Sequence, residues 1–183
     1  IEACAGHTHS HGGDLPAQEM TKWFDTNYHY VVPRLSPGQT FELTSTKPVD
    51  EFLEAKALGV TTRPVLVGPV SYLKLGKATQ DGFDPLSLLD GVLPVYAELL
   101  RRLAAAGAAS VQLDEPCLVL DLTDVERAAL RRAYGVLADA APGLKIMLTT
   151  YFGGLGPNLS TAVTLPVDGL HLDLVRAPGQ LAD

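Results

Sequence analysis

Short apolar runs, each bounded by turn residues, recur along the chain from residue 41 onward. They cover Phe41–Thr44, Pro64–Val67, Val111–Leu113, Ile146–Leu148 and Leu170–Leu172. Runs of this length flanked by glycine, proline and polar residues are typical of β-strands. The pattern therefore predicts five strands.

Helical patterns occupy the intervals between these runs. The longest covers Asp84–Ala106, where leucines recur every three, four or seven residues and so share one face. Asp84 suits the N-cap position, and Gly107 is expected to end the helix. A second helix is predicted to begin at Thr123, where the sequence TDVE forms a capping box. A third, shorter helix is expected over Asp50–Leu58.

The alternation of strands and helices indicates parallel strand pairing, because a crossover helix returns the chain to the same end of a sheet. An open doubly wound sheet and a closed barrel both satisfy this order. No glycine-rich phosphate loop follows the first strand, which favours the barrel. A complete barrel has eight strands in about 250 residues. The 183 residues therefore predict an α/β fold, a parallel (βα)8-type TIM barrel that is incomplete, with about five βα units.

Two segments differ in character along the chain. Residues 1–18 are rich in glycine, histidine, alanine and serine without an apolar period, so we expect a flexible N-terminal segment there. Residues 19–183 are expected to form part of a single barrel domain.

Composition narrows the classes of partner. The chain is 46% hydrophobic and 19% charged, with a formal net charge of −7, so nucleic acid is not an expected partner. No apolar stretch reaches the roughly 18 to 20 residues of a membrane span, which predicts no membrane partner and a cytoplasmic location. Cys4 and Cys117 lie far apart in the sequence, and we expect no disulfide between them.

Functional groups of parallel barrels gather after the C-terminal ends of the strands. In this sequence those positions hold Ser45, Gly68 and Pro69, Asp114 to Pro116, Thr149 to Tyr151, and Asp173 with Arg176. Asp114, Glu115 or Asp173 could supply acid and base to a hydrolase or decarboxylase. Adjacent strand residues face opposite sides, so only one of Asp114 and Glu115 is expected to reach a shared ligand.

The residues around these positions carry a more specific signal. Five segments, in order, resemble the N-terminal domain of the cobalamin-independent methionine synthase family: Glu19–Tyr30 (EMTKWFDTNYHY), Pro64–Val70 (PVLVGPV), Val111–Pro116 (VQLDEP), Leu148–Phe152 (LTTYF) and Gly169–Val175 (GLHLDLV). The resemblance spans Glu19 to Val175, and the order and spacing of the five segments make it specific.

The resemblance implies a two-barrel methyltransferase that moves the methyl group of 5-methyltetrahydropteroyltri-L-glutamate to homocysteine. It implies that the second barrel, absent from this chain, holds the catalytic zinc and homocysteine, so no catalytic residue, metal or other cofactor is expected in this chain and it should be inactive alone. It further implies that Lys22 binds a carboxylate of the folate glutamate tail, with Asn27 as a hydrogen-bonding neighbour. An ammonium and an amide are suitable donors for such a ligand.

Other interpretations remain open at this point. The chain could be a non-catalytic module that binds an anion, or the hydrolase described above. His7, His9 and His11 alternate, so an extended chain would place them on one side as metal ligands, and their role is unassigned. The aromatic residues Trp23, Phe24, Tyr28 and Tyr30 could stack on an aromatic ring of a ligand, but they are interpreted as packing residues, and His29 is unassigned.

Overall fold

The computed structural model describes residues 19–23 and 26–182. Its central feature is a parallel sheet of four strands in the order β4-β6-β7-β8. These strands are β4 (Val65–Val67), β6 (Ser110–Asp114), β7 (Lys145–Thr149) and β8 (Gly169–His171). All three pairings are parallel, so the four carboxyl ends meet at one edge of the sheet. Four of the five expected strands are confirmed.

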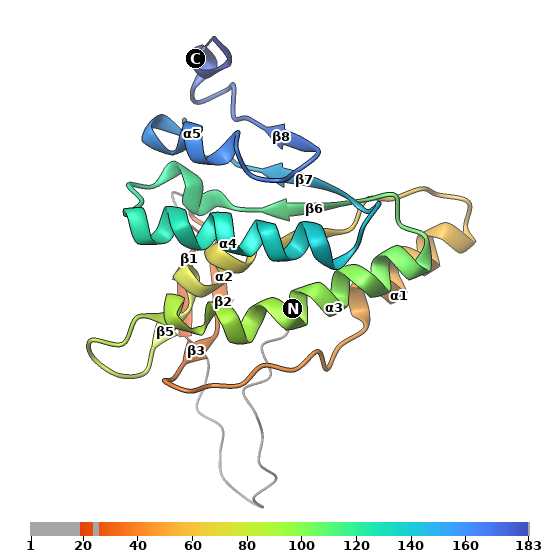
Figure 1. Cartoon of the computed structure of the whole chain (residues 1–183), viewed down its shortest axis with the longest axis horizontal. Coiled ribbons are helices and arrows are strands. Elements are labelled where there is room, and N and C mark those ends of the chain that lie inside the picture. The colour runs from red at the N-terminus through yellow and green to blue at the C-terminus, as the bar shows by residue number, and fades with distance from the viewer. Residues whose placement is uncertain (1–18, 24–25, 183) are drawn as a thin grey trace, which may run out of the picture.

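The long helices of the crossovers lie side by side along this sheet (Figure 1). Helix α3 (Leu89–Ala106) follows the 3-10 turn η1 (Pro85–Leu88), and Gly107 ends it in the left-handed region at φ 90°. The Asp84 carboxylate caps η1 by accepting the Leu86 N–H at 2.9 Å. Helix α4 (Asp124–Ala140) begins with the predicted capping box between Thr123 and Glu126. The predicted end of α3 and the predicted start of α4 are thus confirmed, whereas the expected start of the long helix at Asp84 is wrong, because the first turn after Asp84 is a 3-10 turn and α3 begins at Leu89.

Shorter helices complete the layers. Helix α1 (Lys47–Ala57) begins three residues before the expected Asp50. Helix α2 (Pro69–Leu75) directly follows β4, and the 3-10 turn η2 (Pro116–Val119) directly follows β6. The 3-10 turn η3 (Gly156–Asn158) leads into α5 (Leu159–Ala162), and η4 (Pro178–Leu181) lies near the C-terminal end. None of the helices in the described part of the chain is long and apolar enough to cross a lipid bilayer.

The core lies between the sheet and the helices α2, α3 and α4. Tyr96 and Leu100 of α3, Tyr134 of α4, and Leu113 and Leu148 of the sheet are all at most 1% exposed. Burying side chains of this size is the main favourable contribution to folding, at about 1.5–3 kcal/mol each. The alternation of buried and half-buried residues in β6 follows from the two-residue period of a strand.

The expectation of a strand at Phe41–Thr44 is wrong. Residues 41–46 have no regular structure and pair with no strand in the described part of the chain. Phe41 and Leu43 instead pack on the core, and the Phe41 ring lies against Gly91 of α3. The apolar residues of the segment are thus partly buried without pairing of the backbone to β4.

Two small sheets precede the main one. Strands β1 (Glu19–Lys22) and β2 (His29–Val32) form an antiparallel hairpin. Strands β3 (Arg34–Leu35) and β5 (Lys77–Ala78) form a two-residue parallel ladder. The hairpin was not anticipated from the sequence, since its strands mix polar and aromatic residues and contain no apolar run.

Candidate functional site

The hairpin β1–β2 carries both residues that the sequence analysis assigned to ligand binding. Lys22 is the last residue of β1, and Asn27 lies in the turn that leads to β2. Both side chains are exposed. The structure thus brings Lys22 and Asn27 to the same end of one hairpin.

The pairing register places a second basic side chain beside Lys22. His29 is the direct cross-strand partner of Lys22, and Val31 is the partner of Met20. Directly opposite residues of an antiparallel pair project from the same face, so these four side chains share one outer face. Met20 is 62% exposed and Val31 is 51% exposed, which shows that this face is turned to solvent.

An antiparallel ladder contains two types of residue pair that differ in the distance between their Cα atoms, and Lys22 and His29 form a pair of the closer type. The Trp23 N–H donates to the Tyr28 carbonyl at 2.8 Å, which makes the neighbouring pair Trp23 and Tyr28 a hydrogen-bonded one. The pair Lys22 and His29 is then non-hydrogen-bonded, the type whose Cα atoms lie about 4.5 Å apart. Neither side chain has an acidic partner within the described ranges. The outer face therefore offers two neighbouring basic groups to an external anion.

The inner face of the hairpin is turned toward the protein only in part. Tyr28 on this face is 77% exposed, so its interpretation as a packing residue is wrong. Val32 is 1% exposed, and the rings of Trp23 and Tyr30 lie with their centroids 5.0 Å apart. The Trp23 indole N–H donates a hydrogen bond to the hydroxyl of Tyr151, which follows β7. The Tyr151 hydroxyl in turn lies 3.3 Å from Oδ2 of Asp114, at the end of β6. The hairpin is thus linked to the carboxyl edge of the main sheet.

Asp114 is held in place at that edge. Its Oδ1 accepts a hydrogen bond from Gln112 Nε2 at 2.8 Å. Partial burial raises the pKa of the Asp114 carboxyl above its usual value, while the hydrogen bonds from Gln112 and Tyr151 oppose that shift. Burial first, and the Asp114 carboxylate second, raise the pKa of the Tyr151 hydroxyl well above its ordinary range. Tyr151 therefore remains a neutral donor to Asp114 near neutral pH.

Glu115 lies on the other side of the strand end and is fully buried. Its Oε1 accepts the Val70 N–H at 3.2 Å, and its Oε2 accepts the Ser71 N–H at 2.7 Å. The Cys117 thiol, which is free and buried, lies 3.5 Å from Oε2. Burial raises the pKa of the Glu115 carboxyl to about 7. Glu115 contacts the first turn of α2 and Asp114 contacts Tyr151, so the two carboxyl groups do not share a ligand as an acid and base pair would.

The remaining strand-end residues mainly organise loops. Asp173 accepts the backbone N–H groups of Arg176 at 3.0 Å and Phe152 at 2.9 Å, and these bonds hold the pKa of its carboxyl below the usual value. Thr150 donates to the His171 carbonyl at 3.0 Å. These contacts join the segments after β7 and β8, and they give Asp173 a structural role that the sequence did not indicate.

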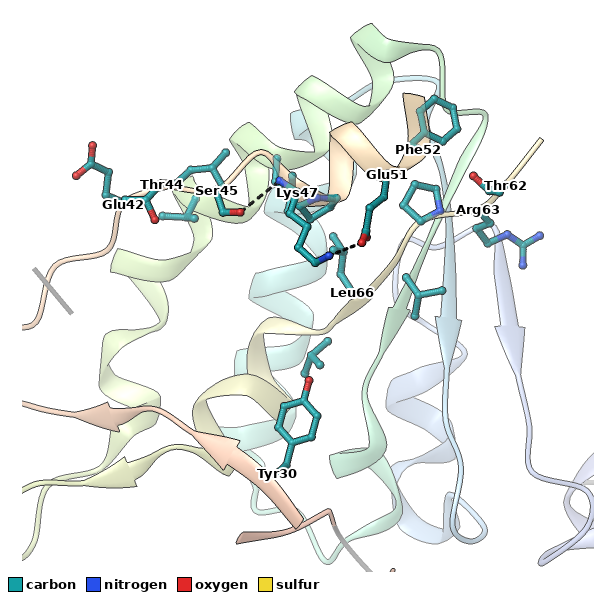
Figure 2. Close-up of a pocket in the computed structure, with 17 residues that line it drawn as sticks. Tyr30, Glu42, Thr44, Ser45, Lys47, Glu51, Phe52, Thr62, Arg63 and Leu66 are labelled. Carbon is teal, nitrogen blue, oxygen red and sulfur yellow. Dashed lines mark hydrogen bonds and ion pairs between the residues drawn. The ribbon is translucent and has the colours of Figure 1, made fainter. Parts of the chain in front are cut away.

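A cavity of about 640 Å³ lies along the free edge of β4 (Figure 2). Its lining includes Ser45, another of the expected strand-end positions, and Tyr30 of the hairpin. Its charged residues are two acids and two bases, Glu42, Glu51, Lys47 and Arg63, and Lys47 is ion-paired with Glu51. The balance of charge gives this cavity no preference for an anion.

The described residues do not fit a zinc site. No group of three or more histidine, cysteine, aspartate or glutamate side chains is arranged to hold a metal ion between residues 19 and 182, residues 24 and 25 excepted. His7, His9 and His11, like Cys4 and Phe24, lie outside the described residues. No chemical step of this chain is therefore assigned to zinc.

Comparison with known proteins identifies relatives along nearly the whole chain. Two curated relatives are both named 5-methyltetrahydropteroyltriglutamate–homocysteine methyltransferase. The one from Caulobacter vibrioides is 71% identical over 182 residues, covering 98% of this chain and 23% of the relative. The one from Nitrobacter winogradskyi is 65% identical over 183 residues, covering 98% and 24%. The chain thus spans about a quarter of the length of these relatives.

Solved structures share the fold at low sequence identity. A putative vitamin-B12 independent methionine synthase from Listeria monocytogenes superimposes with a TM-score of 0.55 at 17% identity, over 75% of this chain and 46% of that one. A methyltransferase from Methanosarcina mazei gives a TM-score of 0.58 at 14% identity, over 84% and 52%. With the parallel sheet described above, this likeness confirms the prediction of an α/β fold of the parallel barrel type that is present only in part.

A family model described as the N-terminal domain of cobalamin-independent synthase matches residues 5–183. That range includes all five segments on which the resemblance was based, from Glu19 to Val175. The chain belongs to the cobalamin-independent methionine synthase family, within its N-terminal domain.

Proposed function

We propose that this chain binds the glutamate tail of 5-methyltetrahydropteroyltriglutamate, within an enzyme that transfers the methyl group of that compound to homocysteine. The relatives at 71% and 65% identity are named for this substrate and this acceptor. Residues 19–183 then form part of a barrel domain, and the zinc and homocysteine sites lie in a part of the enzyme that this chain does not include.

The outer face of the hairpin is the observation that carries the proposal. A glutamate tail offers a series of carboxylates joined by methylene groups. The Lys22 ammonium, exposed and without an acidic partner in the described part of the chain, would bind a carboxylate by a charge-assisted hydrogen bond. His29 stands directly opposite and adds a second donor, and the apolar side chains of Met20 and Val31 would contact the methylene groups. Asn27 contributes an amide donor from the adjoining turn.

Substitution of Lys22 in a complete enzyme that carries this sequence tests the proposal. Lys22→Ala should raise KM for the triglutamate substrate roughly tenfold, because a charged hydrogen bond is lost. KM for the monoglutamate should change little, since that substrate has no extended tail. The kcat should also be unchanged, because the tail binds the ground state and the transition state equally. Added salt should reduce the difference between the wild type and the variant.

Lys145→Ala is the matched control, because Lys145 is an exposed lysine at the opposite, amino end of the sheet. It should leave both KM values at the wild-type level. An unchanged triglutamate KM in Lys22→Ala would refute tail binding by Lys22. A large fall in kcat at constant KM would place Lys22 in the chemistry instead.

A further inference from the structure

The hairpin that carries Lys22 contacts the rest of the protein at its base and near its tip. At its base, Val32 is buried and the Pro33 carbonyl accepts the Lys77 N–H at 2.9 Å, which continues into the β3–β5 ladder. At its tip, the attachment is the hydrogen bond from Trp23 to Tyr151.

The tip attachment is part of a chain of hydrogen bonds that has one direction. The Trp23 indole N–H can only donate, so the Tyr151 oxygen accepts from it. The Tyr151 hydroxyl then uses its own proton to donate to Oδ2 of Asp114 at 3.3 Å. Asp114 is fixed from the other side by Gln112, which donates to Oδ1 at 2.8 Å. Each member thus has one compatible role, and the chain ends on a strand of the main sheet.

The turn itself is stiffened by local bonds. The Thr26 hydroxyl donates to the Trp23 carbonyl at 2.6 Å and accepts the Tyr28 N–H at 3.1 Å. The Trp23 N–H also donates to the Tyr28 carbonyl, so Trp23, Thr26 and Tyr28 are joined by three hydrogen bonds. Lys22 precedes Trp23 directly in the chain, so the contacts that fix Trp23 also restrict the backbone of Lys22.

We propose that Tyr151 and Asp114 are positioning residues that fix Lys22 for tail binding, acting through Trp23. The inference rests on the proposed role of Lys22. Successive residues of an extended strand face opposite sides, so the Trp23 ring points inward to Tyr151 while the Lys22 side chain points outward. When the inner contact is intact, Lys22 is held at a defined place. Without it, Lys22 is held less firmly, and the tail must order the hairpin as it binds.

The variant Tyr151→Phe removes the hydroxyl and keeps the ring. In a complete enzyme carrying this sequence, it should raise the triglutamate KM about three- to tenfold, the range expected when one hydrogen bond is lost. The monoglutamate KM and kcat should stay at their wild-type values. A general loss of fold would instead alter both KM values and kcat.

Tyr134→Phe is the control for removal of a tyrosine hydroxyl. The Tyr134 hydroxyl is buried on α4 and has no hydrogen-bond partner within the described residues. This variant should leave the ratio of the two KM values unchanged.

A double variant separates the positioning role from the proposed function. If Tyr151 acts through Lys22, then Tyr151→Phe should have no further effect on the triglutamate KM once Lys22→Ala is present. Additive effects would show that Tyr151 acts independently and would overturn the inference. If Lys22→Ala alone raises the triglutamate KM but Tyr151→Phe does not, positioning is refuted while tail binding stands. If Lys22→Ala itself has no effect, the proposed function fails, and the positioning inference fails with it.

Fluorescence gives an independent readout in a complete enzyme carrying this sequence, once any tryptophan outside these 183 residues is replaced by phenylalanine, because Trp23 is the single tryptophan of this chain. Loss of the Tyr151 hydroxyl should shift its emission to longer wavelength as the indole becomes more hydrated. Tyr134→Phe should leave the emission maximum in place. An unshifted spectrum in Tyr151→Phe would show that the hydroxyl does not hold the indole, and would overturn the inference.

Discussion

Glu115 and Ser71 are joined by a hydrogen bond of 2.7 Å between Glu115 Oε2 and the Ser71 N–H, although 44 positions separate them in the sequence. The bond ties the segment after β6 to the first turn of α2, and it lies in the core. Ser71 also accepts the Cys117 N–H through its hydroxyl at 3.1 Å, which closes a small polar network. A buried carboxyl group with neutral partners has consequences for stability that can be measured.

The stability of the protein should depend on pH through Glu115. Burial raises the pKa of its carboxyl from 4.5 to about 7, so the folded state favours the protonated form. The resulting stabilisation is fully present below the pKa of the unfolded chain, decreases as the pH rises from 4.5 to 7, and is lost above about 7. The shift corresponds to about 3 kcal/mol of unfolding free energy. Urea unfolding of the wild type and of Glu115→Gln, from pH 4.5 to 8, measures it.

The Gln variant cannot ionise, and all other titrating groups are common to both proteins. The difference in slope between the two stability profiles therefore belongs to Glu115. Parallel profiles across this range would contradict the prediction.

Gly68 should not tolerate a side chain. A Cβ at this position would lie 2.3 Å from Cδ of Glu115. Gly68→Ala must displace the buried carboxyl from its hydrogen bonds, and we expect it to lower the unfolding free energy by about 2–4 kcal/mol. Gly135→Ala is the matched comparison, because Gly135 lies inside α4 and a Cβ there meets no atom within 4 Å. It should raise stability by about 0.5–1 kcal/mol.

Thermal and urea unfolding of the two alanine variants decides the matter. The unfolding free energy should fall in Gly68→Ala and rise in Gly135→Ala. A Gly68→Ala protein as stable as the wild type would show that Glu115 can move away at little cost.

His29 should contribute to binding of the glutamate tail. It stands opposite Lys22 on the outer face of the hairpin, so His29→Ala should raise the triglutamate KM and leave the monoglutamate KM unchanged. The effect should be smaller than that of Lys22→Ala, because an imidazole offers fewer donors than an ammonium. Met20→Ala, on the same face, serves as a control for loss of apolar contact, and its effect should not depend on salt. A His29→Ala enzyme with an unchanged triglutamate KM would limit the site to Lys22.

Much of the fold follows from local features of the sequence. The strands β4, β6, β7 and β8 coincide with apolar runs, because a strand buried in a parallel sheet needs such a run. The ends of α3 and α4 coincide with Gly107 and with the capping box at Thr123, because these residues satisfy backbone groups of their own helix. The family resemblance is also visible in the sequence, since each of its five segments is a contiguous stretch of residues.

Tertiary structure decided the arrangement of the candidate site. The sequence placed Lys22 and Asn27 near each other, but only the hairpin register set His29 opposite Lys22. Phe41–Thr44 has the pattern of a strand, yet its apolar side chains are partly buried against the core without strand pairing.

The links to Asp114 and Glu115 also depend on distant segments. Asp114 contacts Tyr151, which follows β7, and through it Trp23 of the hairpin, while Glu115 contacts Ser71 of α2. Local propensity determines helices, strands and caps, because each depends on neighbouring residues. Hydrogen bonds between residues 37 and 44 positions apart depend on how the elements pack, and no local pattern encodes them.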